Sequence, residues 1–197
     1  MAANDERFGA LAFRYRGALL ALPAVALAIL GKPCGRSIAR GLPLAFAGEF
    51  MRCYAVGYSG KTTRGDTVEA PQLVTAGPYA HVRNPLYLAN FITAAGFALA
   101  FTGRIPRAQR LMLCAAALGT MAAVYSVVVP HEEDFLRKTF GADYEAYEAR
   151  VPRLIPQLKA AEPQNGTFDP GVIRTAEANT FLTFGLMLAV LAWKAPA

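Results

Sequence analysis

The chain has 197 residues, of which 54% are hydrophobic and only 17% are charged, and its formal net charge is +6. Soluble domains carry about a quarter of their residues as charges, so the composition argues against a soluble protein and favours a single membrane domain over residues 1–197. The positive charge does not indicate nucleic-acid binding, because the Lys and Arg residues stand in short connectors between apolar blocks, where they anchor helices at lipid headgroups.

Five apolar blocks predict an all-α fold, a polytopic membrane helical bundle of about five transmembrane helices. The first block, 17–31, is short, but arginines on either side can snorkel to the membrane surface, and we expect it to be a retained anchor rather than a signal peptide. The second block, 38–58, contains Glu49 and Arg52. These two residues share one helical face, where they can pair, and this face is expected to point into the bundle.

The remaining three blocks follow further along the chain. The third, 85–102, begins directly after Asn84, because proline is well tolerated as the first residue of a helix and pushes the preceding residue out of the helical region. The fourth, 111–130, is the most continuous of the five. The fifth, 179–193, ends at Trp193, a typical residue of the membrane interface.

A polar segment between the fourth and fifth blocks has a helical stripe of apolar residues at gaps of three or four. The stripe runs from Leu136 to Val151, with an expected break at Gly141 and a stop at Pro152. Acids and bases lie between the apolar positions, so we expect a surface amphipathic helical cap on the bundle. This segment and the loop 59–83 fall on the same side of the membrane. That side carries more Lys and Arg, which favours the cytoplasm.

Two polar clusters carry the candidate chemistry. In residues 76–87, an irregular backbone lies between a Gly-Pro turn and an Asn-Pro helix start, and its N–H groups and Arg83 can receive a carboxylate. In residues 131–134, three acids follow the fourth block, where one can pair with Arg83 and another can bind a ribose diol or an amino group. Taken separately, these features are more often explained by a simple turn, a solvated acidic face and a buried tyrosine stripe.

Both clusters belong to one longer pattern: a GPY turn, an Arg-x-Pro-x-Tyr helix start, a Glu-Glu pair after the next apolar block, Phe-Gly, two tyrosines and Arg-Val-Pro. The pattern resembles that of the isoprenylcysteine carboxyl methyltransferase and phospholipid methyltransferase family of membrane enzymes. The resemblance covers about residues 74–156, within an expected family-like core of about 37–156, and the helix at about 176–194 is an addition. The matching positions are Gly77-Pro78-Tyr79, Arg83-Asn84-Pro85-Leu86-Tyr87, Glu132-Glu133, Phe140-Gly141, Tyr144, Tyr147 and Arg150-Val151-Pro152.

This resemblance implies a methyltransferase that uses S-adenosylmethionine and acts on a lipophilic acceptor, with an isoprenylcysteine-like carboxylate or a phospholipid amine as the nucleophile. The absence of a GxGxxG motif agrees with a cofactor site outside a Rossmann fold. As catalytic residues, Arg150 and Arg153 would orient the nucleophile. No metal and no nucleic acid are expected as partners. The cofactor-binding residues implied are Tyr79, His81, Val82, Arg83, Asn84, Tyr87, Leu88, Glu132, Glu133, Tyr144 and Tyr147.

One position departs from the family pattern. Asn84 stands where the family has a histidine, and asparagine can form hydrogen bonds but cannot become a cation. We therefore expect the cofactor pocket to be kept without acid–base chemistry at this position. Two alternatives stay open: an NADPH-dependent reductase similar to membrane sterol and steroid reductases, and a non-catalytic membrane adaptor. The alanine-rich composition favours an integral protein of a prokaryotic cytoplasmic membrane.

Overall fold

The computed structural model describes residues 2–60 and 70–195, with side chains described from residue 9 onwards. Within these residues the chain forms seven α-helices and one short 3-10 helix, and no strand is present among them, which confirms the predicted all-α class. The elements are α1 (Ala2–Leu30), α2 (Gly35–Ser59), η2 (Gly77–Ala80), α3 (Pro85–Phe101), α4 (Arg107–Phe140), α5 (Ala142–Arg150), α6 (Pro170–Ala176) and α7 (Ala178–Lys194).

All five predicted apolar blocks coincide with helices to within one residue, and two of these helices extend ten or more residues beyond their blocks. Helix α1 begins well before residue 17, and α4 continues through Pro130 to Phe140. The acidic cluster 131–134 is therefore helical. Consecutive residues on a helix point in directions about 100° apart, so neighbouring acids of this cluster face different surroundings.

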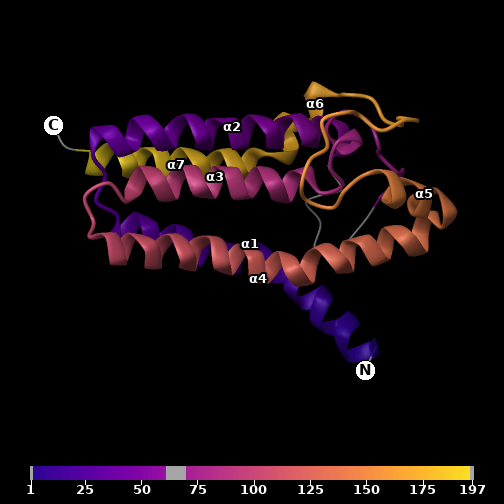
Figure 1. The fold of residues 1–197 in the computed structure, drawn as a ribbon, viewed down its shortest axis with the longest axis horizontal. Coiled ribbons are helices and arrows are strands. Elements are labelled where there is room, and N and C mark those ends of the chain that lie inside the picture. The colour runs from indigo at the N-terminus through magenta and orange to yellow at the C-terminus, as the bar shows by residue number, and fades with distance from the viewer. Residues whose placement is uncertain (1, 61–69, 196–197) are drawn as a thin grey trace.

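The long helices form two layers (Figure 1). Helices α2 and α3 lie side by side in one layer, α1 runs along α4 in the other, and α7 contacts both α3 and α1. The C-terminal part of α4 extends beyond the bundle, and α5, η2 and the chain between α5 and α6 gather at that end. Gly141, at φ +52°, separates α4 from α5. The predicted break and amphipathic cap are thus confirmed, with Tyr144, Tyr147 and Val151 buried together.

Small residues allow α2 and α3 to approach closely. A Cβ atom on Gly96 would lie 2.3 Å from the backbone nitrogen of Ala45, and one on Gly48 would lie 2.4 Å from the Thr93 hydroxyl oxygen. Neither position has room for a larger side chain. Close helix contacts of this kind are typical of bundles in membranes.

By length and composition, two helical segments among the described residues can cross a membrane, Gly9–Leu30 of α1 and Arg107–Phe140 of α4. Helices α6 and α7 meet at a bend of 66° and together qualify as a third. Of the other two predicted spans, α3 has 17 residues and is a shorter apolar helix, and α2 contains the buried residues Glu49 and Arg52. Burial of both side chains confirms that this face of α2 points inward.

Candidate active-site cavity

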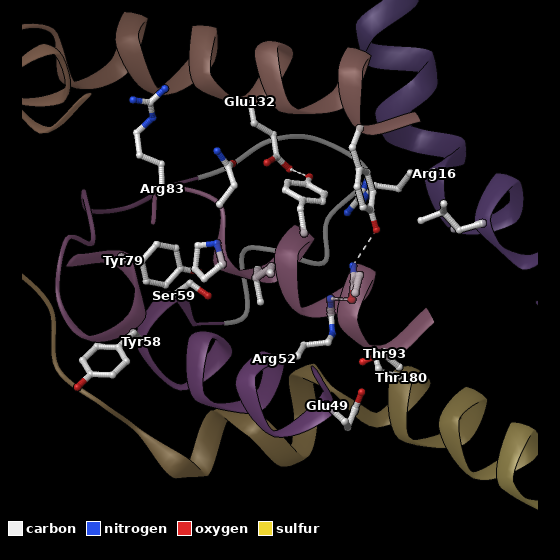
Figure 2. Close-up of a pocket in the computed structure, with 18 of the residues that line it drawn as sticks. Arg16, Glu49, Arg52, Tyr58, Ser59, Tyr79, Arg83, Thr93, Glu132 and Thr180 are labelled. Atoms are coloured by element: carbon white, nitrogen blue, oxygen red, sulfur yellow. Dashed lines mark hydrogen bonds between the residues drawn. The ribbon is translucent and has the colours of Figure 1, made fainter. Parts of the chain in front are cut away.

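A cavity of about 860 Å³ lies between the two layers. Its polar end is at the cap, where Glu132 of α4 and Tyr79 of η2 contribute to the wall (Figure 2). Its apolar end reaches between α1, α3, α4 and α7, where Leu27, Phe97, Ala117 and Met187 line it. Ligand sites in proteins commonly have volumes of about 300–1,000 Å³ and combine apolar walls with a few polar groups.

At the polar end, Glu133 is the centre of a buried cluster of charges, the Glu133 cluster. Its side chain is 2% exposed. Glu133 Oε1 accepts hydrogen bonds from Arg83 Nε at 3.2 Å and from Asn84 Nδ2 at 2.9 Å. Glu133 Oε2 accepts from Arg153 Nη2 at 2.6 Å. Arg83 also pairs with Glu148 at 3.1 Å. The cluster therefore joins the start of α3 to α4, α5 and the chain after α5.

Glu132, the neighbouring acid, faces the cavity instead. Its Oε1 atom accepts a hydrogen bond of 2.6 Å from the Tyr87 hydroxyl, and both side chains line the wall. A carboxyl group has two oxygens with several lone pairs, and the bond from Tyr87 uses only one of them, so acceptor capacity remains toward the cavity. Of the two glutamates in the pair, Glu132 is the one placed to contact a ligand.

Three tyrosines of the cap complete the polar end. The Tyr147 hydroxyl donates to the backbone oxygen of Tyr79 at 2.8 Å. Tyr144 is 1% exposed, and its hydroxyl has no hydrogen-bond partner among the residues that the structure describes. Burial raises the pKa of all three hydroxyls, so each keeps its proton at neutral pH. A buried polar group without a partner costs about 1–3 kcal/mol, a cost that a bound ligand can remove at Tyr144.

The residues implied by the resemblance divide into two groups in the structure. The lining of the cavity includes Tyr79, Arg83, Asn84, Tyr87, Glu132, Tyr144 and Tyr147, and it does not include His81, Val82, Leu88, Glu133, Arg150 or Arg153. His81 Nδ1 lies 2.9 Å from the backbone oxygen of Gln157. The exposed Arg150 donates to the backbone oxygens of Ala146 and Glu162. The roles assigned to both groups stay predictions.

A second polar network lies along the cavity wall. Of its members, only Arg52 was singled out by the sequence analysis. Arg52 Nε and Nη2 donate to the two carboxylate oxygens of Glu177 at 2.9 and 3.1 Å. Arg52 Nη1 donates to Asn90 Oδ1 at 2.8 Å, and Asn90 Nδ2 donates to the Tyr125 hydroxyl at 2.9 Å (Figure 2, dashed lines). We call these four residues the Arg52 chain. Glu177 is 125 positions from Arg52, so no local spacing indicates the pair.

Cavity and fold together describe a helical membrane protein with an internal site that is polar at one end and apolar at the other. Residues 38–143, more than half of the chain, match the phospholipid methyltransferase family, and the chain belongs to this family. The family and the apolar helices together identify an integral membrane protein.

Several curated proteins are similar to parts of the chain. The nickel-cobalt-cadmium resistance protein NccN of Alcaligenes xylosoxydans xylosoxydans is 33% identical over 90 residues, which cover 46% of this chain and 38% of NccN. The "Probable protein-S-isoprenylcysteine O-methyltransferase" of Oryza sativa subsp. indica is 31% identical over 129 residues, 60% of this chain and 61% of the relative. The protein-S-isoprenylcysteine O-methyltransferase B of Arabidopsis thaliana is 29% identical over 125 residues, which cover 59% of this chain and 57% of the relative.

These alignments span between about two fifths and three fifths of the relatives' own lengths. No solved structure matches the chain significantly.

Proposed function

We propose that the chain is a membrane methyltransferase that uses S-adenosylmethionine and methylates a lipophilic acceptor, with an isoprenylcysteine-like carboxylate or a phospholipid amine as the candidate nucleophile. The observation that carries this proposal is the cavity itself. Its polar end is built largely from the segment that matches the family, and its apolar end provides room for a hydrocarbon tail. The names of the plant relatives support the same reaction class.

The residues at the polar end suit this cofactor. Glu132 has acceptor capacity for ribose hydroxyls or an ammonium group. The buried Tyr144 hydroxyl has no hydrogen-bond partner among the described residues, and a bound cofactor would provide one. Tyrosine ring faces such as that of Tyr79 favour a neighbouring cation. When bound, S-adenosylmethionine would supply a methyl group on a positively charged sulfur.

The chain itself has to orient the two reactants and exclude water, because methyl transfer requires an in-line attack. The Glu133 cluster fixes the start of α3, and this start carries the cavity residues Asn84 and Tyr87. Arg153 is proposed to act here as a positioning residue through its bonds to Glu133. Arg150 is exposed and lies outside the lining of the cavity, so its role in orienting the nucleophile stays a sequence-based prediction and is not part of this proposal.

The polar end is proposed to face the cytoplasm of a prokaryotic cell. The distribution of Lys and Arg residues among the connectors supports this orientation, because positively charged loops stay on the cytoplasmic side.

Calorimetry on the detergent-purified protein tests the cofactor. We expect binding of S-adenosylmethionine and of its product S-adenosylhomocysteine, and no binding of NADPH. Binding should weaken in Glu132→Gln and Tyr144→Phe. Glu145→Gln is the matched control, since Glu145 is exposed on α5 and does not line the cavity. Binding of NADPH alone would instead support a reductase.

Acceptor preference is then measured as transfer of a radiolabelled methyl group from S-adenosylmethionine. Two acceptors are compared, a farnesylated cysteine derivative and phosphatidylethanolamine in vesicles. Labelled lipid-soluble product from either one supports the proposed activity. Cofactor binding without transfer to any lipophilic acceptor would favour the non-catalytic adaptor.

A further inference from the structure

The hydrogen bonds of the Arg52 chain can run in only one direction. A guanidinium group only donates, so Asn90 must present its oxygen to Arg52 and its amide nitrogen to Tyr125. The Tyr125 oxygen therefore accepts, and the hydroxyl hydrogen is left for another acceptor. No residue in the described part of the chain accepts it. Asn90 likewise has a second amide hydrogen. The Arg52 chain therefore ends in two donors, the Tyr125 hydroxyl and the Asn90 amide.

Both donors belong to the cavity wall, at an intermediate depth. Tyr125 is 3% exposed and lines the cavity together with Asn90. At a rise of about 1.5 Å per residue, Tyr125 lies roughly 10 Å along α4 from Glu132 and about 12 Å from Ala117 at the apolar end. If the reacting group of a ligand lies at the polar end, the tail of this ligand lies beside the Tyr125 and Asn90 donors.

The charges around the two donors do not favour an anion. Arg16 and Arg52 are cations that line the cavity wall on this side, and Glu49 is a carboxylate of the same wall. Glu177 adds a second carboxylate, paired with Arg52. Two cations and two carboxylates leave no excess positive charge, and a buried charge without compensation is strongly unfavourable. An uncharged oxygen can accept both hydrogen bonds without this cost.

We propose that Tyr125 and Asn90 bind an uncharged oxygen (a carbonyl, ether or hydroxyl) that the acceptor carries within its apolar part. The inference rests on the proposed function and narrows the acceptor to an oxygen-bearing amphiphile. The charged pair behind the donors strengthens them, because successive hydrogen bonds polarise one another. Glu177, the carboxylate at the other end of the Arg52 chain, lies outside the segment 38–143 that matches the family.

The test compares three twelve-carbon probes: 2-dodecanone, dodecanoate and dodecylammonium. Their affinities are measured from the shift in thermal unfolding of the detergent-purified full chain during titration. The ketone is expected to bind most tightly. In Tyr125→Phe, its affinity should fall between about three- and tenfold, the value of one net hydrogen bond. Tyr15→Phe is the matched control, because Tyr15 is exposed on α1 and does not line the cavity.

Tighter binding of either charged probe overturns the inference, as does an unchanged ketone affinity in Tyr125→Phe. The wild-type comparison decides the question even when the variant does not fold. S-adenosylhomocysteine binding is measured on the same preparation. If it binds and the ketone shows no preference, the oxygen site is wrong and the proposed function stands. If it does not bind and the ketone preference persists, the proposed function is wrong and the oxygen site stands.

Discussion

The Glu133 cluster and the Arg52 chain are two buried polar networks beside one cavity, and they end differently. In the Glu133 cluster, the carboxylate accepts bonds from Arg83, Asn84 and Arg153 and does not line the cavity. In the Arg52 chain, the last donor lines the cavity and has no acceptor in the described part of the chain. The Glu133 carboxylate is thus enclosed by its donors, although Arg83 and Asn84 reach the cavity wall, and this enclosed charge holds the structure together. The Arg52 chain instead ends at the wall in a donor that is available to a ligand.

The largest loss of stability is expected when Glu133, the centre of the first network, is replaced. Glu133→Ala leaves two arginines and an amide without their shared carboxylate, and removing one partner of a buried pair costs about 3–5 kcal/mol. For a chain of this size, the thermal unfolding midpoint should fall by about 10 °C, measured by circular dichroism in detergent. Glu145→Ala, at an exposed position, serves as the control. An unfolding midpoint within about 2 °C of wild type would contradict the structural role.

A smaller loss of stability is expected at Glu177, together with a change in ligand preference. Glu177→Gln removes a charge-assisted bond worth about 1.5–3 kcal/mol and leaves Arg52 with less compensation. We therefore expect dodecanoate to gain affinity relative to 2-dodecanone. The measurement is the same titration of unfolding temperature. If the variant keeps the wild-type preference, Arg52 does not determine which charge the cavity accepts.

Glu132 tests the cofactor end without disturbing either network. Glu132→Gln should weaken S-adenosylhomocysteine binding about tenfold, because a hydrogen bond to a charged group contributes about 1.5–3 kcal/mol. The unfolding midpoint should change little, since the amide oxygen can still accept from Tyr87. Calorimetry and thermal unfolding on one preparation separate the two effects. Equal affinity in the variant and the wild type would remove Glu132 from the site.

The smallest effect is expected at Arg150. Its side chain is exposed and bonded to two backbone oxygens, so Arg150→Ala should leave the unfolding midpoint and cofactor affinity unchanged. The rate of methyl transfer is expected to stay within about twofold of wild type. A tenfold slower transfer at unchanged cofactor affinity would instead support its sequence-based assignment as the residue that orients the nucleophile.

The sequence predicts the parts of the site that depend on neighbouring residues. The start of α3 after Asn84 follows from the proline at the next position, and the break at Gly141 follows from a glycine within a helical stripe. The pairing of Arg83 with an acid of the 131–134 cluster spans 50 positions, and the sequence predicts it because both polar segments fall on the same side of the bundle. Local rules and a spaced motif suffice for these features.

Other parts depend on how distant segments meet. The extension of α4 through Pro130 decides which of the two glutamates faces the cavity, and a proline in an apolar block favours the opposite expectation, a helix end. The partner of Arg52 comes from a helix that the motif does not include. Asn90 and Tyr125 are single polar residues in apolar blocks, and only their contact reveals a role.

Glu177 also matters for the order in which the protein is made. In the order of synthesis α7 follows α1 to α5, so Arg52 of α2 is made well before its carboxylate partner. Its burial is then stabilised late, when Glu177 reaches α2 and Lys194, at the other end of α7, donates to the backbone oxygens of Ile29 and Gly31 at the end of α1. The two ends of α7 therefore tie together α1 and α2, the first two helices of the chain, and a variant that loses both contacts would leave the Arg52 guanidinium buried without its carboxylate.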